Sequence, residues 1–114
     1  MKMEQPLVSW LMPVYNAEKT LVRAMDSMLN QTYKNIEIIV INDNSYDNTS
    51  VLLSEYQNKD SRVKVFINKN RAGVAGALNY GLPLCKGKYI ARMDADDVSS
   101  FDRLEKQVRF MEND

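Results

Sequence analysis

Short apolar runs alternate along this chain with longer segments in which apolar residues recur every three or four positions. Residues 7–14 and 37–42 are almost continuously apolar, which is typical of parallel strands that are buried on both faces. Residues 62–67 alternate between apolar and polar side chains, and residues 89–93 form a short fourth run. The pattern predicts four strands, the third less buried than the second.

Helical periodicity fills the two intervals that separate the first three strands. After Asn16, which can cap a helix, apolar residues fall on one face of the predicted helix. These residues are Leu21, Val22, Met25, Met28 and Leu29. After the second strand a polar turn leads into another helix, for which Asp47 or Asn48 is the expected cap. Each helix is expected to pack one face against the sheet.

Glycine and proline mark the limits of the remaining helices. We expect a third helix over residues 73–85, opened by Gly73 and ended by Gly87. Pro83 lies within this segment and is expected to kink or shorten the helix, because proline lacks a backbone N–H. A last helix is predicted after Asp102, which forms a capping-box pattern with Glu105 three residues later.

The order of elements predicts an α/β fold. Strands that are joined by helices pair in parallel with right-handed crossovers. We therefore expect an open, mainly parallel Rossmann-like sheet with strand order 3-2-1-4 and helices on both faces. The length of 114 residues fits a single domain, residues 1–114. In such a sheet the ligand binds beyond the carboxyl ends of the strands, here between the first and fourth strands.

Two aspartates follow the fourth strand at this expected edge. Asp94 and Asp96 are two residues apart and can face one direction, while Asp97 faces away. Paired carboxylates repel one another unless a cation or a proton neutralises them, and their oxygens suit Mg²⁺ or Mn²⁺. The alternative is that they are an acidic helix start, although Asp102 is the better cap. The first interpretation makes Asp94 and Asp96 an anchor for a metal-bound diphosphate.

Three further polar or aromatic side chains are expected at the same edge, each with two interpretations. Asp43 can form an ordinary turn, or it can accept a hydrogen bond from a base or a ribose hydroxyl. Tyr15 can stack on a base or cover the rim of the core. Arg71 can contact phosphate or remain solvated.

Composition narrows the chemistry available to the chain. There is no His, which excludes a His general base, a His zinc ligand and a Ser-His-Asp triad. The single cysteine, Cys85, excludes an internal disulfide. Fifteen basic residues balance 15 acidic residues, so the chain lacks the excess of basic residues that is typical of a nucleic-acid binder. No nucleic-acid partner is therefore expected.

The apolar run near the start of the chain bears on localisation. Residues 7–14 fall far short of the roughly 20 residues that cross a bilayer, and their flanks do not match a signal peptide. We therefore expect no transmembrane segment and a cytoplasmic protein, either free or peripheral at a membrane.

Several sequence fragments occur in the order and at the spacing of a known family. They are residues 8–16, 29–33, 37–45, 73–79, 87–90 and 94–97. Together they resemble the nucleotide-binding half of glycosyltransferase family 2, which has the GT-A fold. The resemblance covers essentially the whole chain.

This resemblance implies metal-dependent, inverting transfer of a sugar from a nucleotide-sugar donor, most often a UDP-sugar, with Mn²⁺ or Mg²⁺ as cofactor. The implied nucleotide-sugar contacts are Pro13, Tyr15 and Asn16 around the base and ribose, Asp43 on the base, Asp94 near the ribose, and Asp96 on the metal with Asp94 as a second candidate metal ligand. Arg71, proposed from its own position after the third strand, is counted with them as a phosphate contact.

The chain also departs from the family pattern. Asn42 stands where many members have Asp, Asn44 replaces a common Gly, and Arg71 stands near a position often held by Asn. Members continue into an acceptor-binding half that carries the catalytic base, so we expect no catalytic residue in this chain and no activity from it alone. The alternative is a non-catalytic α/β nucleotide-binding or assembly module. Self-association through the surface that the acceptor half would cover is also expected.

Overall fold

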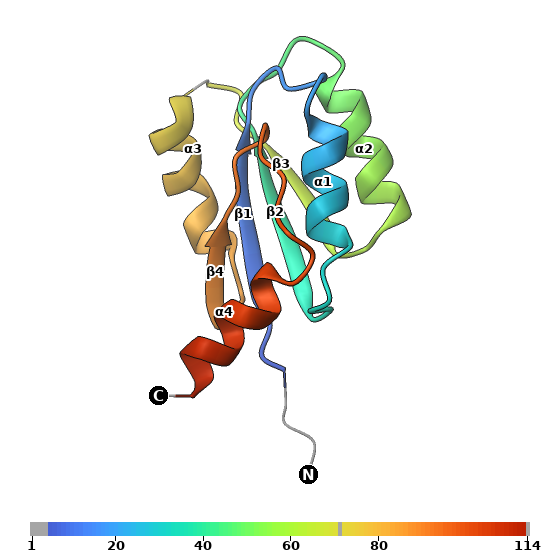
Figure 1. Ribbon diagram of the computed structural model, residues 1–114. Helices are drawn as coiled ribbons and strands as arrows, with labels where there is room; N and C mark the ends of the chain where they lie inside the picture. The colour runs from blue at the N-terminus through green and yellow to red at the C-terminus, as the bar shows by residue number, and fades with distance from the viewer. Residues whose placement is uncertain (1–4, 71, 114) are drawn as a thin grey trace.

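The computed structural model describes residues 5–70 and 72–113, and its centre is one four-stranded sheet (Figure 1). The strands are β1 (Val8–Val14), β2 (Ile36–Asn42), β3 (Val63–Ile67) and β4 (Tyr89–Arg92). All neighbouring strands pair in parallel, in the order β3-β2-β1-β4. The predicted fold class and strand order are confirmed.

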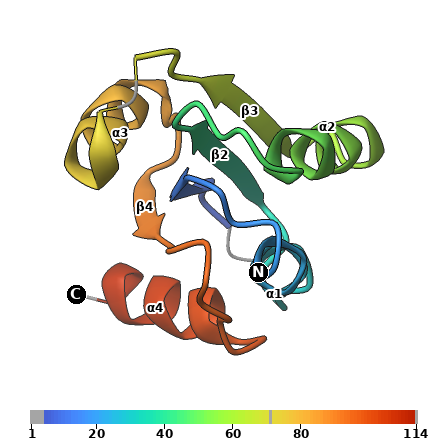
Figure 2. The same ribbon diagram turned by 90° about the horizontal axis from the view of Figure 1, so that it is seen from above.

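Helices cover both faces of this sheet, as predicted. They are α1 (Leu21–Leu29), α2 (Thr49–Lys59), α3 (Gly73–Gly81) and α4 (Arg103–Glu112), with a short 3₁₀ turn, η1 (Leu82–Leu84). Figure 2 shows α3 on one face and α1, α2 and α4 on the other. In the part of the chain that the structure describes, no helix is both long and apolar enough to cross a membrane.

The central strands β1 and β2 are buried along their whole length because both of their faces are covered. Trp10 and Met12 of β1 point into the larger core beneath α1, α2 and α4. Leu11 points the other way and packs with Ile41 and Ala77 under α3. The edge strand β3 is only partly buried, which confirms the reading of its alternating sequence.

A buried carboxylate at the amino end of the sheet organises the turn before β4. Glu37 is 3 % exposed and accepts hydrogen bonds from Ser9 Oγ (2.6 Å), the Lys86 N–H (2.7 Å) and Lys64 Nζ (3.0 Å). Burial raises the pKa of Glu37, but these hydrogen bonds outweigh it and hold the pKa below its ordinary value. Glu37 is therefore a stabilising anion within the fold.

Gly87 belongs to this turn and does not end a helix, so that prediction is wrong. A Cβ at Gly87 would lie 2.5 Å from the Ser9 backbone nitrogen and 2.7 Å from Ser9 Oγ. The glycine is needed because the chain passes very close to β1, where the Gly87 N–H donates to Ser9 Oγ (2.8 Å).

Some of the helix ends lie where the sequence predicts them, and others do not. Pro83 lies in η1, so it shortens α3 as expected, and Asp47 Oδ1 accepts the Thr49 N–H (2.9 Å) at the start of α2. Asn16 is not the cap of α1, which begins five residues later after Thr20.

The predicted capping box of the last helix is also absent from the structure. Asp102 precedes α4 but makes no side-chain cap hydrogen bond, and its carboxylate pairs instead with Lys106 (3.1 Å). The Leu104 N–H in the first turn is accepted by Gln31 Oε1 (3.1 Å). A side chain from another element therefore occupies the place that a local cap would take.

The Glu37 network makes stability depend on pH in a defined direction. A carboxyl whose pKa is lowered by folding stabilises the protein above its ordinary pKa of 4.5, and this contribution is lost as pH falls through the lower folded value. We expect Glu37→Gln to lower the free energy of unfolding by about 1–2 kcal/mol at neutral pH. The difference from the parent should shrink at acidic pH, as measured by urea denaturation.

The exposed Glu55→Gln variant is the matched control and should change stability little at either pH. Equal stability of the parent and Glu37→Gln at neutral pH would contradict the anchoring role of Glu37.

Candidate functional site

The loops that follow β1, β2 and β4 meet at the carboxyl-end edge of the sheet (Figure 1). Parallel pairing brings them there, and hydrogen bonds join them to one another. The Asp43 N–H donates to the Val14 carbonyl (2.8 Å), and the Met93 N–H donates to the Leu11 carbonyl (3.0 Å). The segment that leads to Asp94 and Asp96 therefore runs beside β1.

Asp43 lies at the end of β2 and is 2 % exposed. Its carboxylate accepts the Ala72 N–H (3.0 Å), the Gly73 N–H (2.9 Å) and Asn68 Nδ2 (3.2 Å). Gly73 has a φ of 76°, a backbone conformation that favours glycine. Asp43 thus anchors the start of α3, a structural role that its turn-like sequence did not indicate.

A small pocket lies beside Asp43. It has a volume of about 50 Å³ and is lined by Pro13, Val14, Tyr15, Asp43, Gly73, Val74 and Ala77. The structure therefore brings together Pro13, Tyr15 and Asp43, all predicted site residues. The lining residues of α3 were missed, although the glycine that opens this helix after the third strand was a signal for them. Arg71 lies outside the described residues.

Asn16 connects the loop after β1 to the loop after β2. It has a φ of 48°, its Oδ1 accepts the Tyr46 N–H (2.9 Å), and its own N–H donates to Ser45 Oγ (2.9 Å). The rings of Tyr15 and Tyr46 meet edge to face with centroids 6.2 Å apart. Tyr46 is 83 % exposed and was not predicted, although an aromatic residue within a polar turn was the available signal.

Asp47 reinforces the same connection. It accepts hydrogen bonds from the Thr49 N–H (2.9 Å) and the Glu18 N–H (3.3 Å), and the Ala17 N–H donates to Thr49 Oγ1 (2.8 Å). Burial raises the pKa of Asp47, but hydrogen bonds from Thr49 and Glu18 outweigh it and lower the pKa. The two loops are therefore fixed by several polar contacts.

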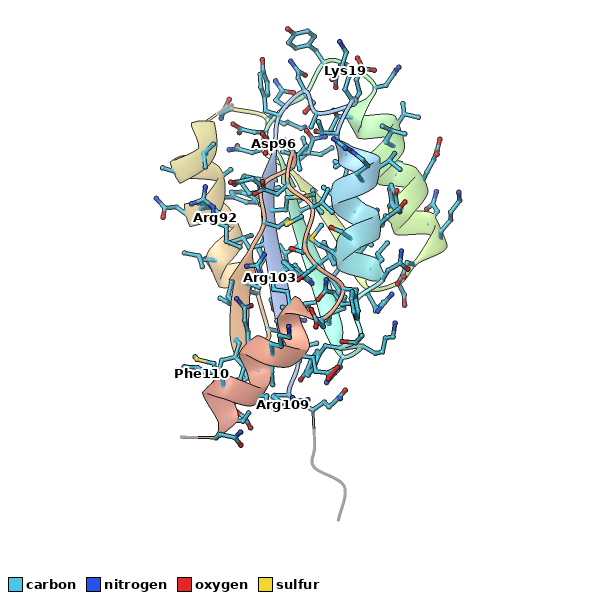
Figure 3. The ribbon with its side chains drawn as sticks, viewed as in Figure 1. Lys19, Arg92, Asp96, Arg103, Arg109 and Phe110 are labelled. Carbon is cyan, nitrogen blue, oxygen red and sulfur yellow. The ribbon has the colours of Figure 1, made fainter. Side chains whose placement is uncertain are left out.

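Asp94 and Asp96 lie on the turn after β4, and Figure 3 shows Asp96 near the carboxyl-end edge of the sheet. Asp94 is half-exposed and pairs with Arg92 (3.2 Å), while Asp96 is exposed. The described residues contain no cluster of three or more His, Cys, Asp or Glu that could hold a metal by itself. The half-exposed Asp94 and the exposed Asp96 still fit Mg²⁺ or Mn²⁺, because such ions commonly take one or two carboxylates together with waters and substrate phosphates.

A larger hollow than the pocket beside Asp43 lies elsewhere in the described part of the chain. A groove of about 740 Å³ runs between β4 and α4, and neither Asp43 nor Asp96 lines it. The size of a pocket therefore does not identify the site. The carboxyl-end edge is the candidate because polar residues gather there and hydrogen bonds join its loops.

Four parallel strands in the order 3-2-1-4, with polar loops at the carboxyl-end edge, define a Rossmann-like domain. Residues 9–114 match the family model described as Glycosyl transferase family 2. The chain belongs to this family, which confirms the resemblance seen in the sequence.

Known relatives and solved structures agree with this assignment. An uncharacterized glycosyltransferase of Haemophilus influenzae is 46% identical over 109 residues, covering 96% of this chain and 44% of the relative. The Escherichia coli protein WfgD, named as a UDP-Glc:alpha-D-GlcNAc-diphosphoundecaprenol beta-1,3-glucosyltransferase, is 42% identical over 109 residues, covering 96% of this chain and 42% of the relative.

Among solved structures, residues 1–349 of S. aureus TarS in complex with UDP-GlcNAc superpose with a TM-score of 0.87 at 26% identity. The match covers 93% of this chain and 31% of that one. The chain thus spans less than half the length of each of these three proteins.

The contacts of Asp43 predict a structural cost when its carboxylate is removed. Asp43→Ala leaves the Ala72 and Gly73 N–H groups without this acceptor, and we expect it to lower the free energy of unfolding by about 1–2 kcal/mol. Hydrogen exchange at these two amides should accelerate more than exchange in the centre of β1.

Asn68→Ala is the control for this experiment, because it removes a donor to Asp43 and leaves both backbone amides bonded. It should cost less stability than Asp43→Ala. Unchanged protection of the two amides in Asp43→Ala would show that the carboxylate does not hold the start of α3.

Proposed function

We propose that this chain is the donor-binding part of a metal-dependent, inverting glycosyltransferase. The observation that carries the proposal is the joined set of loops at the carboxyl-end edge, where Pro13, Tyr15 and Asp43 share a pocket and the exposed Asp96 follows the neighbouring strand. Membership of glycosyltransferase family 2 supports it.

The proposed donor is a UDP-sugar. The name of WfgD specifies UDP-Glc, and TarS was crystallised with UDP-GlcNAc, which supports UDP as the nucleotide here. In this chain Pro13, Tyr15 and Asn16 would line the base and ribose. Asp43 would reach the base at the rim of the pocket while holding the start of α3, and Arg71 would approach the phosphates.

The acidic turn, residues 94–97, would hold the diphosphate through Mg²⁺ or Mn²⁺. Asp96 is the proposed metal ligand because it is the more exposed carboxylate. Asp94, which pairs with Arg92, would lie near the ribose and is the second candidate metal ligand. A bound divalent cation neutralises the negative charge that develops on the leaving nucleoside diphosphate. The carboxylates of Asp94 and Asp96 would hold that cation, and through it the diphosphate, while the bond between the sugar and the diphosphate breaks.

Inversion needs a base that takes the proton from the acceptor hydroxyl. We assign no residue of this chain to that step, and we propose that the chain by itself, as a single domain, binds the donor without transferring the sugar. The acceptor and the sugar are left open.

The role of Asp96 can be tested by calorimetric titration of the folded chain with UDP, with and without Mn²⁺. Asp96→Ala should weaken Mn²⁺-dependent binding by at least about tenfold, since even the loss of an outer-shell partner of a metal ligand typically costs that much. Its stability should stay within about 0.5 kcal/mol of the parent, because the side chain is exposed.

Asp97→Ala removes a neighbouring exposed carboxylate and should bind as the parent does. If Asp96→Ala also binds like the parent, the metal assignment is wrong. If the folded parent binds no nucleoside diphosphate, the donor-binding function itself is wrong, and the alternative of an assembly module is favoured.

A further inference from the structure

Thr20 stands immediately before α1, the position at which a threonine hydroxyl usually caps the first turn of a helix. In this structure it makes no such cap. Thr20 Oγ1 instead donates to the carbonyl of Ala95 at 2.9 Å, and it approaches the nearby Ala17 carbonyl only to 3.5 Å. The hydroxyl therefore holds the residue between Asp94 and Asp96, 75 positions away in the sequence.

Polar side chains of α1 and of the residues just after it also hold the segment that follows the aspartates. Ser27 Oγ accepts the Ser99 N–H (3.1 Å). Gln31, which is fully buried, donates through Nε2 to the Ser100 carbonyl (2.7 Å) and accepts the Leu104 N–H (3.1 Å). Thr20 stands just before α1, Ser27 lies within it, and Gln31 follows its end. Together these three polar side chains position the chain from Ala95 to the start of α4.

The hydrogen bonds within the acidic turn do not fix its position against α1 or the loop after β1. The Asp97 N–H donates to the Asp94 carbonyl (3.0 Å), which shapes the turn but does not place it against another element. Arg103 donates to Ser99 Oγ (3.0 Å) and to the Arg92 carbonyl (3.3 Å), which brings the two ends of the loop together. The bond from Thr20 ties the middle of the turn to the segment between β1 and α1.

We propose that Thr20 is a positioning residue of the donor site: it orients the Ala95 peptide, and so directs the flanking carboxylates of Asp94 and Asp96 toward the metal-diphosphate. This inference rests on the proposed function. Without the hydroxyl, the Ala95 carbonyl can turn toward solvent, since the residue is only partly buried. The carboxylates on either side then rotate with it, while the pocket beside Asp43 keeps its own contacts.

The test is the ratio of UDP affinities measured by calorimetry with Mn²⁺ and with EDTA. Thr20→Val keeps the shape of the side chain and removes the hydroxyl, and we expect it to lower this ratio about fivefold, the effect of one lost hydrogen bond. UDP binding in EDTA should be unchanged. Thr20→Ser should restore the ratio of the parent, because it retains the donor.

Thr32→Val is the matched control, since Thr32 is exposed and bonds to the Phe101 carbonyl through its backbone N–H (2.8 Å). It should leave both titrations unchanged. Thr20→Ala carries the same expectation as Thr20→Val and replaces it if the valine variant fails to fold.

Two outcomes separate this inference from the proposed function. If the parent binds UDP more tightly with Mn²⁺ and the variants that lack the hydroxyl show the same ratio, or weaken equally in both buffers, Thr20 has no positioning role and the function stands. If the folded parent binds no UDP, or if Mn²⁺ does not raise its affinity for UDP, both the proposed metal-dependent donor site and the role of Thr20 are wrong.

Discussion

The parallel pairing of β1 with β2 on one side and β4 on the other is the constraint on which this molecule depends. Both central strands are buried on both faces, so a shift of one residue in register would turn every core side chain to the wrong helix layer. Parallel pairing also forces the loops after β1, β2 and β4 to one edge. The site is thus a consequence of the same register that builds the core.

Polar residues at that edge serve the fold as well as the proposed ligand. The carboxylate of Asp43 is buried and its oxygens accept backbone N–H groups, Asn16 bonds to the neighbouring loop, and Thr20 bonds to the acidic turn. Buried polar groups need partners, and loops that supply them become fixed on a rigid scaffold. These hydrogen bonds hold the acidic turn in place, and Asp96 within it remains exposed.

The sequence was a good guide where burial decided the outcome and a poor one where a distant partner did. Strand positions, strand order and the shortening of α3 at Pro83 were all predictable. The cap assigned to Asn16, the capping box of Asp102 and the helix end assigned to Gly87 were wrong. In each case a residue from elsewhere in the chain supplied or received the contact: Ser45 and Tyr46 for Asn16, Gln31 at the start of α4, and Ser9 beside Gly87.

By itself the sequence determined an α/β sheet with polar strand ends, because the spacing of apolar residues records which side of each element is buried. It also placed Pro13, Tyr15 and Asp43 at one edge, where the structure joins them in a pocket. Only the tertiary structure decided that Asp43 holds α3 and that Thr20 reaches Ala95. Hydrogen bonds between segments dozens of residues apart depend on how the helices dock on the sheet, and no local periodicity encodes that docking.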